Sequence, residues 1–147
     1  MTQKKFPLWA GWLAVFSIFA LNTFWLAPTV MRTQGPFAGN VTFILVRMGA
    51  LAAFCYWLAA LHQSKRWAVI RAASFAMFIE QVPFKALSIQ LQGLASLQVA
   101  GEAAPTWDGI LMYLGFSYIL FVPVVILVAF VMSEIAVQRR KPKKSAA

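Results

Sequence analysis

Residues 67–92, WAVIRAASFAMFIEQVPFKALSIQLQ, decide the fold of this chain. The stretch is apolar enough to enter a membrane, yet it carries several polar residues: Arg71, Glu80, Gln81, Lys85, Gln90 and Gln92. A charged residue near the middle of a transmembrane helix costs roughly 2.5–3.5 kcal/mol on insertion scales. Such a helix is poorly suited to face lipid on all sides. We therefore expect other helices, from this chain or from a partner, to cover it.

The composition around this stretch is that of a membrane protein. Of the 147 residues, 61% are hydrophobic and 12% are charged, whereas soluble domains average about 45–50% apolar and about 25% charged residues. The mean hydropathy is +0.73. The sequence predicts an all-α integral membrane protein with a single domain. Four transmembrane helices form one bundle, over about residues 8–30, 41–61, 67–90 and 109–132, before a basic cytoplasmic tail over 133–147.

Breaker residues set the expected boundaries. Gly35-Pro36 and Gly39-Asn40 predict a turn-rich loop over residues 31–40. Pro28 is expected near the exit of the first span, and Pro83 and Pro123 predict kinks in the third and fourth. For residues 84–104 a helix extension, a re-entrant segment and an interfacial segment all fit the sequence.

The distribution of basic residues predicts the topology. With four spans, the N-terminus, the second loop and the C-terminus lie on one side of the membrane. That side holds ten basic residues, and the other side holds only Arg32 outside the spans. Positive charge marks the cytoplasmic side. We therefore expect both termini in the cytoplasm and a multi-pass protein of the bacterial inner membrane.

Several functional classes are excluded by composition or by missing residues. The formal charge of +9 does not indicate nucleic-acid binding, because the basic residues sit at span ends. Cys55 is the single cysteine, so no intramolecular disulfide can form, and His62 is the single histidine, so two-histidine haem ligation within the chain is impossible. We find no catalytic motif and no metal-ligand cluster. The chain is expected to be neither an enzyme nor a cofactor or metal binder.

Polar residues of all four spans fall at nearly the same depth. The 1.5 Å rise per helical residue places Asn22, Arg47, Glu80 and Tyr118 in the outer half of the bilayer. Arg47 and Glu80 are natural partners, since each charge alone is costly in hydrocarbon. Asn22 or a tyrosine is expected to be a third member. The cluster is either an ion pair that fixes helix register or a site for a proton, an ion or a polar head group.

A second feature of the third span is a polar stripe. On an ideal helix, five of its polar residues share a sector of roughly 60°, and Glu80 lies about 100° away. We expect the stripe to line a wet groove or to pack against polar groups of another helix. Its residues are Ser74, Gln81, Lys85, Ser88 and Gln92.

The end of the chain is basic and either binds anionic lipid or only anchors the topology. The residues expected to meet lipid head groups are Arg139, Arg140, Lys141, Lys143 and Lys144. Membrane lipids are thus expected partners, together with other integral membrane proteins or further copies of the chain. The favoured function is a non-catalytic subunit that packs against and stabilises other membrane proteins. The alternative is a small oligomeric transporter or channel with an Arg47/Glu80 site.

Overall fold

A computed structural model describes residues 7–91 and 106–140 of the chain. These residues are almost entirely helical, and no strand occurs among them. Three of the helices, Leu8–Gln34, Pro36–Ala60 and Trp107–Arg140, are long and apolar enough to cross a membrane. Their length and composition indicate a membrane protein, as the sequence predicted. The helix that carries the polar stripe is not one of these three.

Two of the four helices are interrupted by a π-helical turn, and the other two are single α-helices. The first comprises α1 (Leu8–Leu21), the π-helical turn η1 (Asn22–Leu26) and α2 (Ala27–Gln34). The second is α3 (Pro36–Ala60). The third comprises α4 (Arg66–Ile79), the π-helical turn η2 (Glu80–Phe84) and the helical residues 85–91. The fourth is α6 (Trp107–Arg140).

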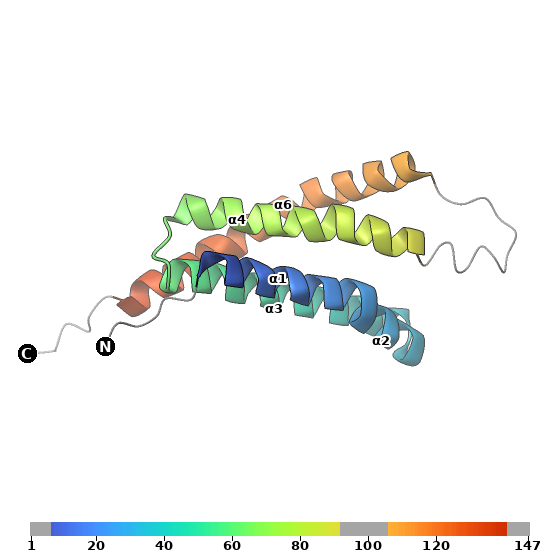
Figure 1. Ribbon diagram of the computed structural model, residues 1–147, viewed down its shortest axis with the longest axis horizontal. Helices are drawn as coiled ribbons and strands as arrows, with labels where there is room; N and C mark the ends of the chain where they lie inside the picture. Colours follow the sequence, from blue (N-terminus) through green and yellow to red (C-terminus); the bar gives the residue numbers. More distant parts are fainter. Residues whose placement is uncertain (1–6, 92–105, 141–147) are drawn as a thin grey trace, which may run out of the picture.

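Successive helices run in opposite directions (Figure 1). The start of α1, the connection between α3 and α4, and the end of α6 all lie at one end of the molecule. We call this the α3–α4 end, and we call the opposite end, where α2 meets α3, the α2–α3 end. α6 packs against both α3 and α4, and α3 also packs against α1 and α2.

A single residue separates α2 from α3. Gly35 has φ of 97°, which an L side chain rarely adopts, and Pro36 starts the next helix. Gly39 lets the two helices approach closely, because an added Cβ would stand 2.9 Å from the Met31 Cα. The expected loop over residues 31–40 is therefore wrong. Most of it is helical, since two glycines allow a much tighter hairpin than a loop.

α6 is longer than the predicted fourth span. It extends to Arg140, so the first eight residues of the predicted tail, 133–140, are helical. Ser133 and Ala136 are buried, and Glu134 forms an ion pair with Arg66. These contacts continue the packing of α6 against the rest of the molecule.

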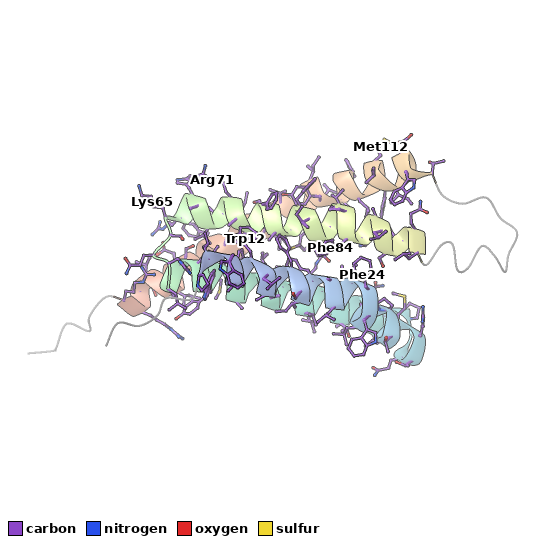
Figure 2. The ribbon with its side chains drawn as sticks, in the orientation of Figure 1. Trp12, Phe24, Lys65, Arg71, Phe84 and Met112 are labelled. Carbon is purple, nitrogen blue, oxygen red and sulfur yellow. The ribbon has the colours of Figure 1, made fainter. Side chains whose placement is uncertain are left out.

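The main apolar core fills the half of the molecule nearer the α3–α4 end. Residues of all four helices contribute to it, among them Phe19, Leu51, Cys55, Val69, Met77 and Val125. A smaller apolar cluster at the other end contains Val82, Ala86, Ile110 and Leu114. Between the two, Phe24 and Phe84 point toward one another across the gap between α1 and the third helix, with ring centroids 6.0 Å apart (Figure 2).

Candidate functional site

The charged pair predicted from depth lies between the two apolar clusters. Arg47 Nη1 of α3 lies 3.6 Å from Glu80 Oε2 of η2. The Glu80 side chain is fully buried, and that of Arg47 is 6% exposed. Two opposite charges so deeply buried are tolerable only when they are paired and hydrogen-bonded. The contact is too long for a direct hydrogen bond, so the neighbouring polar groups matter.

Hydrogen bonds extend this pair to all four helices. Thr23 Oγ1 of η1 donates to Glu80 Oε1 at 3.4 Å. Arg47 Nη1 donates to Gln81 Oε1 at 2.8 Å, and Gln81 Nε2 donates to Ser117 Oγ of α6 at 3.0 Å. We call Thr23, Arg47, Glu80, Gln81 and Ser117 the Arg47–Glu80 cluster. It is a continuous set of polar contacts across the bundle.

The two π-helical turns place these groups opposite one another. In η1 the Ala27 N–H donates to the Asn22 carbonyl, five residues back, and the next residue, Pro28, has no N–H. The Thr23 carbonyl therefore does not receive its usual helical hydrogen bond. It accepts instead from Ser88 Oγ of the third helix at 3.4 Å. Widening the turn thus exposes backbone polarity to a neighbouring helix.

The second π-helical turn has the same origin. Pro83 lies inside η2, where its missing N–H and its ring prevent a regular turn. The Lys85 N–H donates to the Glu80 carbonyl, five residues back. Three successive residues, Glu80, Gln81 and Val82, are buried together. A regular helix would turn one of them outward, so the wide turn brings both polar side chains into the interior.

Aromatic rings enclose the Arg47 guanidinium. Its central carbon lies 4.3 Å from the Phe121 ring centroid and 5.0 Å from that of Phe43. Lys85 Nζ lies 5.2 Å from the same Phe43 centroid. Cations over aromatic faces are stabilised by the ring quadrupole, most strongly where water is scarce. The Phe43 ring is thus in contact with two cations.

Three polar atoms at this level have no hydrogen-bond partner among the described residues. They are Asn22 Oδ1, Arg47 Nε and Glu80 Oε2, and each is buried. A buried polar atom without a partner costs about 1–3 kcal/mol. The cluster therefore holds unused capacity to bind a polar group.

No group of three or more His, Cys, Asp or Glu side chains that could hold a metal ion occurs in the described ranges.

Asn22 and Tyr118 lie near the cluster but bond to backbone instead. Asn22 Nδ2 donates to the Phe43 carbonyl at 3.0 Å, and Tyr118 Oη donates to the Ser74 carbonyl at 2.9 Å. Neither is the third member expected beside the ion pair. That place is taken by Gln81, which the stripe contained and the predicted cluster did not.

The polar stripe is turned into the molecule. Gln81 and Ser88 are buried, and Ser74 and Lys85 are partly buried. The chain's own helices thus cover this part of the stripe. Gln92 lies outside the described residues.

The predicted lipid-binding residues are only partly described. Arg139 and Arg140 end α6 and are exposed. Arg139 Nη1 donates to Tyr56 Oη at 3.5 Å, and its guanidinium lies 5.7 Å from that ring centroid. Lys141, Lys143 and Lys144 lie outside the described ranges.

Thr23 was missed as a member of the site, and Ser117 was left out of the predicted cluster although its depth matched. Single hydroxyl side chains in apolar spans give little signal, because they often bond to their own helix backbone. Thr23 precedes Pro28 by one wide turn, and this spacing was the available clue.

The chain matches no known protein family, no curated protein and no solved structure.

Proposed function

We propose that this chain is a non-catalytic membrane subunit that holds a transmembrane helix of another protein in a groove between α1 and α3. The proposal is supported by an apolar groove of about 510 Å³ on the outer surface of these helices. Small side chains line much of it: Ala10, Gly11 and Ala14 from α1, with Ala50 and Ala53 from α3. Small residues let helix backbones approach closely, which drives helix association in membranes.

The groove has the length and shape that a helix requires. On α1 it runs from Ala10 to Ile18, roughly 12 Å, and on α3 from Ala50 to Leu61, roughly 16 Å. Trp57 closes part of its floor by lying against Gly11, where an added Cβ would clash with the indole ring. Two or three turns of a partner helix therefore fit along it.

The concave shape favours a foreign partner over a second copy. A two-fold symmetric dimer through this surface would place the groove opposite itself, hollow against hollow. A second copy using a different face would leave its own groove open and form an unclosed chain of molecules. A convex helix from another protein fills the groove without either problem.

The test combines site-specific crosslinking with purification of the full chain. A photo-crosslinking amino acid at Ala14 or Ala53 is expected to capture a foreign membrane protein. The same reporter at Gly49 is the matched control. Gly49 lies one turn from Ala53 on α3, but its surroundings are open and it does not line the groove.

Groove-filling variants extend the test to affinity. Ala14→Phe and Ala53→Phe are expected to lose the stoichiometric partner in mild detergent, whereas Gly49→Phe keeps it. Thermal unfolding of each purified variant checks that the fold survives. Crosslinks at Gly49 as strong as those at Ala53, or to lipid alone at both groove positions, would contradict the proposal.

The subunit is proposed to cross the bacterial inner membrane four times with both termini in the cytoplasm. The support is the antiparallel order of the helices and the clustering of basic residues at the α3–α4 end, including Lys65 and Arg71 (Figure 2). Reporter fusions after Ala147 and near Gly101 should then report opposite sides. Fusions that report the same side would overturn the four-span topology.

A small oligomeric transporter or channel is the second candidate. Its support is the Arg47–Glu80 cluster, which is buried and lies at two π-helical turns, a feature frequent at functional sites. A purified homo-oligomer without foreign partners would favour this candidate. Glu80→Gln should then abolish transport in vesicles while the oligomer persists.

A further inference from the structure

We infer that a cavity beside Lys85, at the α2–α3 end, binds a phosphate group. The cavity has a volume of about 120 Å³ and lies between the α2–α3 hairpin and the third helix. Four polar side chains line it: Thr23, Asn40, Lys85 and Ser88. It is distinct from the apolar groove between α1 and α3 and goes beyond the proposed subunit function.

The charges around the cavity favour an anion. Arg47 Cζ and Lys85 Nζ lie 5.0 and 5.2 Å from the same Phe43 ring centroid, and Arg47 Nη1 lies 3.6 Å from Glu80 Oε2. Arg47 is already paired with Glu80. Among the described residues no carboxylate lies within 4.0 Å of Lys85. At formal charges the group carries one excess positive charge, which is costly inside a bundle unless an anion balances it.

The lining suits an oxyanion more than a bare halide. Lys85 supplies an ammonium group, and Asn40 supplies amide N–H donors at the mouth, where it is exposed. Thr23 and Ser88 also line it, with hydroxyls that donate to Glu80 Oε1 and to the Thr23 carbonyl, so Lys85 and Asn40 are the donors offered to a ligand. A single buried water needs roughly 10–15 Å³, so the cavity has room for a tetrahedral anion with accompanying water. Phosphate is an abundant oxyanion at the membrane surface. It occurs there in lipid head groups, and it occurs free in the adjoining solution.

The cavity also has apolar lining residues. Met31 and Ile89 line it together with Ala27 and Pro28. Apolar side chains beside a cation match the junction of a phospholipid phosphate and its acyl chains. Free inorganic phosphate would use only the polar interior, so the two sources can be separated experimentally.

The test measures thermal stabilisation of the purified full chain in neutral detergent. The probes are inorganic phosphate at constant ionic strength, phosphatidylglycerol, and dioleoylglycerol, which has acyl chains but no phosphate. Chloride is the anion control. We expect phosphatidylglycerol to stabilise the protein and dioleoylglycerol not to do so. If inorganic phosphate also stabilises it, the phosphate group alone suffices; if only inorganic phosphate does, the ligand is the free anion.

Variants link the effect to the cavity. Lys85→Gln should weaken apparent affinity at least about tenfold, as expected for a lost charge-assisted contact. Lys85→Arg should retain most of it. Asn40→Asp places a carboxylate at the exposed mouth and should weaken binding by repulsion, even if Lys85→Gln does not fold. The matched control is Lys65→Gln, at the α3–α4 end and outside the cavity (Figure 2).

Three results would overturn the inference. Equal stabilisation by dioleoylglycerol and phosphatidylglycerol would show that acyl chains alone are bound. Equal weakening by Lys65→Gln and Lys85→Gln would show a general charge effect. Unchanged binding in both Lys85→Gln and Asn40→Asp would place the phosphate elsewhere. None of these outcomes depends on the groove between α1 and α3.

Discussion

The two halves of this molecule pack by different means. Toward the α3–α4 end, regular helices meet through apolar side chains such as Phe19, Leu51 and Val125. Toward the α2–α3 end, the same helices contain two π-helical turns, a buried ion pair and a polar cavity. The apolar half owes its stability to close packing, which tolerates exchanges between hydrophobic side chains of similar volume. The polar half depends on a few directional contacts, each of which needs its partner.

This difference shows where polarity can be kept inside a small bundle. Pro28 and Pro83 each widen a helical turn, and the widened turns face one another through Thr23 and Glu80. Backbone and side-chain polar groups then satisfy each other between helices. In membranes, backbone groups freed by proline need such partners. Local irregularity and buried charge therefore occur together.

The largest expected effect comes from breaking the buried pair. Arg47→Met or Glu80→Gln should each destabilise the fold by about 3–5 kcal/mol, because the remaining charge is buried without its partner. The double variant should recover much of this loss. Thermal and denaturant unfolding in detergent, arranged as a double-mutant cycle, measures the coupling. Simply additive effects would mean that the two residues do not stabilise one another.

A smaller effect is expected at two glycines of α3. Gly39→Ala should cost roughly 1–3 kcal/mol, because its Cβ would meet the Met31 backbone of α2. Gly49→Ala should instead stabilise the protein by about 0.5–1 kcal/mol, since nothing lies within 4 Å of its Cβ and alanine favours the helix. The unfolding midpoints of both variants in one detergent give the comparison. A loss at both positions would show that α3 is closely packed along its whole length.

The smallest effect is expected from the ion pair at the α3–α4 end. Arg66 and Glu134 form a pair of the same chemistry as Arg47 and Glu80, but their side chains are 50% and 29% exposed. Glu134→Gln should change stability by no more than about 1 kcal/mol, and the change should shrink as salt is added. Unfolding at low and high salt tests this. If Glu134→Gln lowered the free energy of unfolding as much as Glu80→Gln does, independently of salt, the two ion pairs would contribute equally to stability.

The apolar spans were predictable because they depend on composition and length. The short α2–α3 connection was not, although Gly35 and Pro36 were recognised as breakers. Breakers show that a helix must end, but not how soon the next begins. Here the positive φ of Gly35 and the close approach at Gly39 reduce the connection to one residue. Such a hairpin depends on contact between two helices, which sequence periodicity does not contain.

The depth of the polar residues was predictable, but their pairing was only partly so. Counting residues along ideal helices put Arg47 and Glu80 at one level. In the structure Arg47 Nη1 lies 3.6 Å from Glu80 Oε2. The same counting put Glu80 about 100° from Gln81 and its stripe. At the π-helical turn both side chains are buried, and Gln81 joins the cluster and accepts from Arg47. An ideal helix could not reveal this, because proline changed the pitch at that position.

The one-residue turn at Gly35 also bears on how the protein is made. The first two helices are so closely joined that we expect them to enter the membrane as a unit, with Arg47 already inside it. Its hydrogen-bond partner Gln81 lies 34 residues further along the chain. At roughly 5–20 residues per second, the ribosome needs roughly 2–7 s to synthesise that distance. During those seconds Phe43 is the only one of the groups that contact Arg47 in the folded chain to have been synthesised. We therefore expect the nascent hairpin to depend on the insertion machinery until the third helix arrives.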